Sequence, residues 1–189
     1  LLEKQVILYH KVKLFKQRIS LHNHKVADER IKNAYALIGD VEGRTLDKQQ
    51  MLSIVKEAHN HLIIAGAGTG KTTFLRRVVE ESRKRAVVVA PTGIAAINAG
   101  GVTIHSFFQL PLHPFIPGMK IESKFAFSKE KRSIIKTMDI LIIDEISMVR
   151  CDLLEAIDSV LRRFRNKYKP FGGVQLLMIG DLQQLSPVI

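Results

Sequence analysis

The sequence predicts an α/β domain built on a parallel sheet with helices on its faces, and three observations support this fold class. From Leu46 onward, short aliphatic runs alternate with longer amphipathic segments, which is the pattern of a doubly wound sheet. A glycine-rich turn joins the first aliphatic run to the helical segment that follows it. The third run ends in two adjacent acidic residues, Asp144 and Glu145.

Two helical patterns precede this domain. One apolar stripe comprises Leu8, Val12, Phe15 and Ile19, and a second comprises Ala27, Ile31, Ala34, Tyr35 and Ile38. We therefore expect a small helical lead-in over residues 1–45 and the α/β domain over residues 46–189. These basic helices could be solvated structural elements or could contact nucleic acid, and the sequence favours the structural role.

The expected strands are short and rich in Ile, Leu and Val, which suits burial on both faces of a sheet. They cover Leu62–Ala65, Ala86–Ala90, Ile140–Ile143 and Gln175–Ile179. Helices are expected over Thr72–Arg83 and Asp152–Phe164, where Asp152 and Glu155 have the spacing of an N-terminal capping box. The three prolines of Leu110–Gly118 indicate a loop.

The glycine-rich turn has the sequence of a phosphate-binding loop. Glycines let successive backbone N–H groups point at phosphates, and the following helix N-terminus adds its positive dipole. We expect Lys71 to reach the β- and γ-phosphates and Thr72 to offer its hydroxyl to Mg²⁺. Ala65 stands where the motif usually has glycine, so the match is to a relaxed form. The residues expected to bind nucleotide in this loop are Gly66, Ala67, Gly68, Thr69, Gly70, Lys71, Thr72 and Thr73.

Asp144 and Glu145 supply the acidic groups that a phosphate loop requires on a neighbouring strand. We expect Asp144 to orient Mg²⁺ through water and Glu145 to be the base that polarises the attacking water. An acidic strand end that merely meets solvent is the alternative. The glycine-rich loop upstream favours the catalytic role, because the two motifs are expected together.

Two glutamines are further candidates. Gln184 follows the last strand, and a neutral amide beside the γ-phosphate can sense hydrolysis, so we expect it to act with Lys71 and Glu145. Gln50 can hydrogen-bond adenine through its amide donor and its carbonyl acceptor. Asp47 and Gln50 also have the spacing of a capping box, and that alternative stays open.

The chain is strongly basic, with 29 Lys and Arg against 18 Asp and Glu and a formal charge of +11. This balance suits nucleic acid, although ribosomal and membrane-surface proteins share it. The single cysteine, Cys151, cannot form an intramolecular disulfide and fits a reducing compartment. No apolar run approaches the roughly 20 residues of a membrane span, and no signal peptide is evident. We expect a cytoplasmic protein, nucleoid-associated if bacterial, with no membrane partner.

Two basic segments have alternative explanations. In residues 120–136 the cations are interleaved with Phe125 and Phe127, so the segment could track phosphates and stack a base. A solvated helix with inward-facing phenylalanines is the alternative that the pattern favours. A second cluster could be the solvent end of a helix, where cations suit the dipole; it comprises Arg162, Arg163, Arg165, Lys167 and Lys169.

Longer segments resemble a known family. They are Ala90–Ala96, Gly100–Phe107, Ile143–Met148, Lys169–Gln175 and Gly180–Pro187. Together they resemble the Pif-type DNA helicases of superfamily one, relatives of RecD, over roughly residues 46–188. The resemblance implies a RecA-like first motor domain with a P-loop NTPase fold. Such a domain binds ATP and Mg²⁺, holds single-stranded DNA and translocates 5′ to 3′.

The resemblance also implies roles for individual residues. Gln50 becomes the adenine reader and Gln184 the γ-phosphate sensor. Pro91, Thr92, His105 and Ser106 match segments that contact the DNA strand in such helicases. A polar loop rim at Thr103–Ser106 is the alternative.

The chain departs from the family in its loop, Ala-Gly-Ala-Gly-Thr-Gly-Lys-Thr, which is closer to the UvrD-like helicases that run 3′ to 5′. In the resembled family a second RecA-like lobe follows and carries an arginine that completes the ATP site. We expect that lobe to be this domain's partner, and the domain alone to hydrolyse ATP poorly. The expected function is that of the ATP-binding lobe of a DNA helicase. A DNA-dependent P-loop ATPase of repair or recombination that does not unwind DNA is the alternative.

Overall fold

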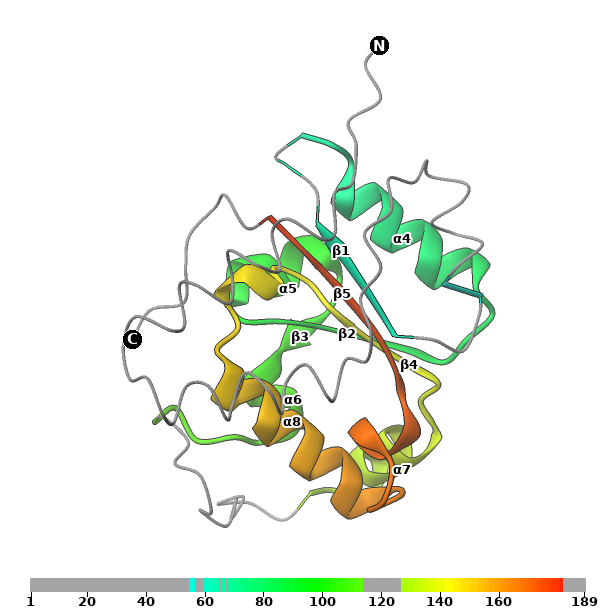
Figure 1. Cartoon of the computed structure of the whole chain (residues 1–189), viewed down its shortest axis with the longest axis vertical. Coiled ribbons are helices and arrows are strands. Elements are labelled where there is room, and N and C mark those ends of the chain that lie inside the picture. Colours follow the sequence, from blue (N-terminus) through cyan, green and yellow to red (C-terminus); the bar gives the residue numbers. More distant parts are fainter. Residues whose placement is uncertain (1–54, 57–59, 65, 67, 114–126, 182–189) are drawn as a thin grey trace.

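A five-stranded sheet forms the centre of the computed structural model, which describes residues 55–56, 60–64, 66, 68–113 and 127–181. All of its strands are parallel, and their order is β1-β5-β4-β2-β3 (Figure 1). The strands are β1 (His61–Ile64), β2 (Ala86–Ala90), β3 (Val102–Thr103), β4 (Ile140–Ile143) and β5 (Gln175–Gly180). The predicted fold class is confirmed. The expected lead-in over residues 1–45 lies outside the described residues.

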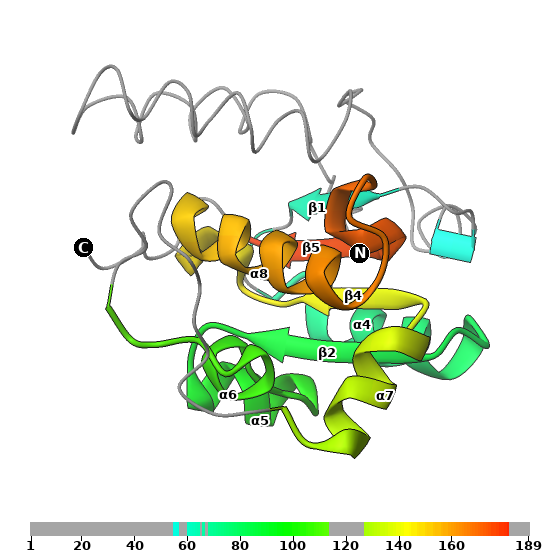
Figure 2. The ribbon, with the colours of Figure 1, turned by 90° about the horizontal axis from the view of Figure 1, so that it is seen from below.

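Helices pack against both faces of the sheet. They are α4 (Lys71–Glu81), α5 (Gly93–Ala99), α6 (Ile104–Phe108), α7 (Lys129–Thr137) and α8 (Cys151–Phe164), with short 3₁₀ helices η1 (Ile146–Met148) and η2 (Pro170–Gly173). Figure 2 shows α8 alongside β4 and β5. Within the described part of the chain, no helix is long and apolar enough to cross a membrane.

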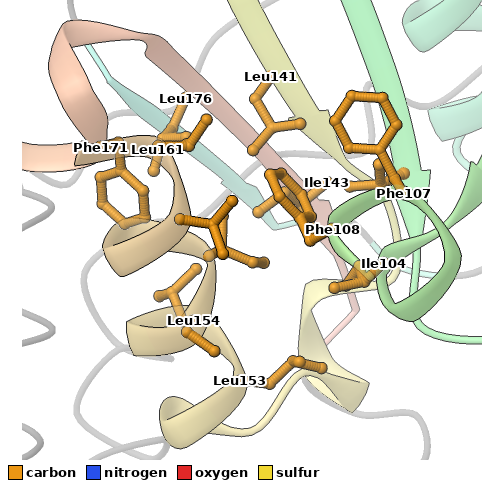
Figure 3. Packing of buried hydrophobic residues seen from close by; sticks show 14 of the residues in the cluster. Ile104, Phe107, Phe108, Leu141, Ile143, Leu153, Leu154, Leu161, Phe171 and Leu176 are labelled. Atoms are coloured by element: carbon orange, nitrogen blue, oxygen red, sulfur yellow. The ribbon is translucent and has the colours of Figure 1, made fainter. Parts of the chain in front are cut away.

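The alternation of side chains along β4 divides the core into two layers. Leu141 and Ile143 pack with α6, α7 and α8. Figure 3 shows the labelled side chains of α6 and α8 around them. Ile140 and Ile142 point to the other face and pack with α4. All four residues of β4 are fully buried, because helices cover the strand on both sides. This burial explains why the strand has no polar residue until its end.

The expected element bounds are close to those observed, with one clear error. α8 begins at Cys151, and its N-cap is Arg150, which has no capping side chain. Asp152 is therefore not the cap: it lies in the first turn, where both of its carboxylate oxygens accept hydrogen bonds from Arg150. The loop prediction holds for residues 110–113, the described part of that segment, which form neither helix nor strand.

Several residues of the two basic segments are held by contacts within the fold. Phe127 is buried and packs edge-on against Phe164, with ring centroids 4.9 Å apart, so the inward-facing alternative is confirmed for this residue. Arg162 pairs with Asp158. Arg165 reaches across to α7 and donates to three backbone carbonyls near its end, those of Ile135, Lys136 and Met138. Phe125, Lys120 and Lys124 lie outside the described residues.

Gly101 determines how the chain enters β3. A Cβ atom on this residue would lie 2.3 Å from the carbonyl oxygen of Val88, so any side chain would force the backbones of β2 and β3 apart. Gly93, eight positions earlier, would meet nothing within 4 Å if it carried a Cβ. Close packing therefore requires glycine at position 101, before β3, and not at position 93, at the start of α5.

We predict that Gly101→Ala destabilises the chain by about 1–3 kcal/mol, the usual cost of overpacking. Gly93→Ala should be neutral or slightly stabilising, because Gly93 is helical and alanine favours helix by about 0.5–1 kcal/mol. Urea unfolding followed by circular dichroism measures both. Equal effects of the two substitutions would contradict the packing described for Gly101.

Candidate active site at the carboxyl edge of the sheet

The glycine-rich loop leads from β1 into α4 through two residues with left-handed backbone. Gly68 has φ 70° and Gly70 has φ 87°, values that a side chain rarely allows. Within the loop, Thr69 Oγ1 donates to the carbonyl oxygen of Gly66 at 2.8 Å, and Lys71 Nζ donates to the same oxygen at 3.2 Å. The first turn of α4 has no capping side chain, so its N–H groups suit an anion.

The expected carboxylates follow β4 directly. Asp144 is only 6% exposed, and its backbone N–H donates to the Val89 carbonyl at 2.9 Å, continuing the β2–β4 ladder by one residue. Glu145 then turns the chain sharply with φ 51° and ψ 47°. A left-handed backbone is unfavourable for a glutamate, and such strain is often found at functional sites. η1 begins directly after this turn, so the chain at Glu145 no longer follows the direction of β4.

The charged groups at this edge influence one another's pKa. Burial raises the pKa of Asp144, and a hydrogen bond from the Glu145 backbone N–H and the positive charge of Lys71 partly offset this effect. Burial also raises the pKa of Glu145, and the negative charges of Asp144 and Asp181 raise it further, while Lys71 opposes the shift. The carboxyl edge therefore brings Lys71 together with the predicted acidic pair.

This pair of carboxylates fits a divalent cation. Glu145 Oε2 is buried and has no hydrogen-bond partner, and the charged form of Asp144 is disfavoured by burial. A hard cation would stabilise both carboxylates. Among the described residues, no group of three or more His, Cys, Asp or Glu could hold a metal by itself. A nucleotide-bound Mg²⁺ needs no such group, because phosphates and waters supply most of its ligands.

Asp181 is a buried acid near the loop to which the sequence analysis assigned no role, although it lies within the Gly180–Pro187 segment. It follows β5, is 3% exposed, and lies near the loop, because a Cβ on Gly66 would be 4.0 Å from its Oδ2 atom. The signal was present in the sequence, since an aliphatic run ending in an acid is the pattern that identified Asp144. Asp181 was missed because the functional role in this segment was assigned to Gln184, three residues later.

The residues expected to contact DNA lie beyond β2 and β3, at the same edge. Thr92 accepts a hydrogen bond from Ala95 N and caps α5, and Thr103 accepts one from Ser106 N and caps α6. His105 and Ser106 thus lie in helix α6 and not in a loop, and their contact with DNA stays a prediction. Burial lowers the pKa of His105, which favours the neutral ring.

Lys131 connects α7 to this segment, a role that its place in a basic run did not indicate. Its Nζ atom donates to the Ser106 carbonyl at 2.9 Å and lies 5.9 Å from the centre of the Phe107 ring. The connection spans 25 positions of the chain. Nothing local in the sequence indicates such a contact.

Of the remaining predicted site residues, the structure describes Thr72, Thr73 and Pro91. Thr72 is half-buried at the start of α4, and Thr73 is exposed. Pro91 is half-buried just after β2. Gln50, Ala67 and Gln184 lie outside the described residues, so their expected roles stay predictions.

A strand, a loop with left-handed glycines, an uncapped helix start and a buried acidic strand end define a P-loop nucleotide-binding domain. Comparison with known families identifies which one. The profile of the PIF1-like helicases matches residues 42–189. This chain belongs to the PIF1-like helicase family.

Individual relatives agree with this assignment. The chain is 35% identical to the ATP-dependent DNA helicase PIF1 of Saccharomyces cerevisiae over 147 residues, which are 75% of this chain and 17% of that protein. A crystal structure of Bacteroides Pif1 bound to ssDNA is 49% identical, with TM-score 0.71, over 75% of this chain and 33% of that one. Another, of Bacteroides sp. Pif1 in complex with ADP-AlF4, is 50% identical, with TM-score 0.70, and covers 75% and 33% of the two chains. The chain thus spans a third or less of these relatives.

We predict that Asp144→Asn raises the melting temperature of the nucleotide-free chain at pH 7, because it removes a charge that burial disfavours.

Asp139→Asn should instead lower the stability of the chain. Asp139 accepts two side-chain hydrogen bonds from Arg85, and these, with the Arg85 backbone N–H, lower its pKa to about 2. Its loss should destabilise the chain by up to about 1 kcal/mol, as for exposed ion pairs.

Calorimetry at several pH values measures both variants. The contribution of Asp139 should be complete above pH 3.8 and disappear as pH falls toward about 2, since its folded pKa is the lower one. A fall in melting temperature for Asp144→Asn would show that the carboxylate is already well stabilised and would contradict the site described above.

Proposed function

We propose that this chain is the ATP-binding lobe of an ATP-dependent DNA helicase that binds Mg-ATP and single-stranded DNA at the carboxyl edge of its sheet. The observation that carries the proposal is the convergence of Lys71, Asp144 and Glu145 at that edge, where the loop follows β1 and the acid pair follows β4 of one parallel sheet. The relatives support it, since the yeast relative is named an ATP-dependent DNA helicase and Bacteroides Pif1 was crystallised with ssDNA.

In this proposal the nucleotide phosphates lie against the loop from Gly66 to Thr73. Lys71 Nζ, which rests on the Gly66 carbonyl, would turn to the β- and γ-phosphates. Thr72 and, through water, Asp144 would hold Mg²⁺, which neutralises charge developing on the phosphoryl group. Gln50 would bind adenine and Gln184 would sense the γ-phosphate.

Glu145 would be the base that accepts a proton from the attacking water. Burial and the charges of Asp144 and Asp181 raise its pKa, which makes its carboxylate a better proton acceptor than an exposed glutamate. The buried Oε2 atom, which has no partner, is available to orient water. Asp181 would act through its charge, which raises the pKa of Glu145.

DNA would lie across the helices that follow β2 and β3. Pro91, Thr92, His105 and Ser106 would contact the strand, and His105, whose pKa is lowered by burial, would contribute a hydrogen bond and not a positive charge. A second RecA-like lobe would complete the ATP site, and closure of the two lobes would step the protein along the strand with 5′ to 3′ polarity. The second candidate is a repair or recombination ATPase that uses DNA without unwinding it.

The intact protein tests the function directly. We expect single-stranded DNA to stimulate ATP hydrolysis and a tailed duplex to be unwound from its 5′ tail. An ATPase rate that ignores added DNA would contradict the proposal, and stimulation without unwinding would favour the second candidate. The 189-residue chain should hydrolyse ATP roughly 10³- to 10⁵-fold more slowly, because an arginine from a partner lobe contributes that factor in related enzymes.

We predict that Lys71→Ala weakens ATP binding by roughly ten- to a hundredfold, the value of a charge-assisted hydrogen bond of about 1.5–3 kcal/mol. Titration with a fluorescent ATP analogue measures it. Lys129→Ala is a matched control, since Lys129 is exposed at the start of α7. Unchanged affinity in Lys71→Ala would show that the loop does not hold the phosphates.

Lys131→Met should weaken the binding of single-stranded DNA by a few-fold, or about 1 kcal/mol, because α6 loses its link to α7. Fluorescence anisotropy of a labelled thymidine oligomer measures the affinity. Lys129→Met removes a charge from the same helix without touching α6. If both variants lose the same affinity, the effect is one of net charge and Lys131 does not position α6.

A further inference from the structure

An exposed tyrosine stands among cations at the edge of the sheet opposite the candidate active site. Tyr168 is 81% exposed in the turn between α8 and η2, just before β5 begins. Lys167 and Lys169, its neighbours in the chain, are exposed, and so is Arg163 in the last turn of α8, whose guanidinium lies 5.6 Å from the centre of the Phe164 ring. We define these four residues as the Tyr168 surface. The six residues of β5 separate it from the active-site edge by roughly 20 Å, at about 3.3 Å per residue.

Hydrogen bonds to backbone atoms of the turn hold this surface in place. The Tyr168 N–H donates to Asn166 Oδ1 at 2.9 Å, and the Lys169 N–H donates to the Asn166 carbonyl at 3.3 Å. Arg162 Nη1 donates to the Lys167 carbonyl at 3.2 Å and ties the turn to α8. These contacts use backbone atoms, the Asn166 amide and the Arg162 guanidinium. The tyrosine ring stays exposed on a fixed support, which lowers the entropy cost of binding a ligand there.

The charge of this turn is not balanced locally. The sequence contains no Asp or Glu between Asp158 and Asp181. Asp158 pairs with Arg162 and also accepts a hydrogen bond from the Phe171 N–H. The Lys167 ammonium lies 4.9 Å from the centre of the Tyr168 ring, so a cation and an aromatic face are presented together. The surface therefore suits a partner that combines negative charge with flat apolar groups.

We propose that the Tyr168 surface binds single-stranded nucleic acid, with one base stacked on the Tyr168 ring and adjacent phosphates beside Lys167, Lys169 and Arg163. Proteins that bind single strands usually stack unpaired bases on aromatic side chains and hold the phosphates with nearby positive charges. Duplex DNA keeps its bases stacked inside and offers none to the ring. An acidic peptide would satisfy the lysines but leave the ring uncovered. The inference rests on the proposed function in taking DNA as the partner and adds a contact away from the ATP edge.

Tyr168→Trp places a single fluorescent indole on the surface, because the wild-type chain contains no tryptophan. We expect a thymidine oligomer to quench the fluorescence of the introduced indole in the 189-residue chain, and an abasic oligomer of equal length and charge to leave it unchanged. Val79→Trp is the matched control, because Val79 is exposed on α4, far along the chain from this turn. Quenching by both oligomers alike, by neither, or equally in the control would overturn the proposal.

Affinity tests the same contact in two further ways. Tyr168→Ala should weaken binding of the thymidine oligomer about five- to a hundredfold, the range for loss of one stacked base, and should not affect binding of the abasic oligomer. The double variant Lys167→Gln, Lys169→Gln should reduce the slope of log affinity against log salt by about 0.7 for each phosphate that a lysine no longer neutralises. An unchanged slope, or displacement of the DNA by polyglutamate as readily as by unlabelled oligomer, would overturn it.

These outcomes separate this inference from the proposed function. If the chain binds DNA and His105→Ala weakens binding, while Tyr168→Ala leaves the affinity unchanged and the Tyr168→Trp fluorescence is not quenched, then the inference fails and the proposed function stands. If neither the variants nor the wild-type chain binds single-stranded DNA, both fail.

Discussion

The carboxyl ends of parallel strands all meet at one edge of the sheet, and this constraint positions every functional group of the candidate active site. β1, β5 and β4 are adjacent, and their register places Ile64 beside Gly180 and Ile143 beside Met178. The residue that follows each strand is therefore close to those that follow its neighbours. A loop, a carboxylate pair and a third acid come together although more than 110 residues separate the first from the last.

The same arrangement leaves the nucleotide-free edge electrostatically unfavourable. Three acidic residues, Asp144, Glu145 and Asp181, face one lysine, and burial disfavours the charged forms of the first two. The left-handed backbone of Glu145 adds strain. The rest of the domain offsets these costs with a core that covers β4 completely on both faces. A divalent cation and phosphates bound at this edge, as we propose, would relieve these unfavourable charges.

Much of the fold and the centre of the site could be predicted from the sequence, because their signals are local. Aliphatic runs identified four of the five strands, and the glycine loop and Asp144–Glu145 are contiguous motifs. β3 was missed because it has only two residues, Val102 and Thr103, too few for any period. The cap assignment of Asp152 failed because Arg150 offers that carboxylate two hydrogen bonds. Other features depend on distant residues and have no local signal: the Lys131–Ser106 link spans 25 positions, and Arg165 reaches α7 across 27 to 30. A basic cluster in the sequence cannot show that Arg162 and Arg165 are held by the fold while the cations beside Tyr168 are exposed.

The central claim is that Mg-nucleotide binds at the carboxyl edge of the sheet, between the glycine loop and the acid pair. Amide NMR shift mapping of the chain with Mg-ADP tests it most directly. The account predicts the largest changes at Gly66, Gly68, Thr72 and Asp144, and almost none at Arg85, Asp139 and Gln175, where the strands begin. Changes centred on that opposite edge, or none at saturating nucleotide, would contradict it.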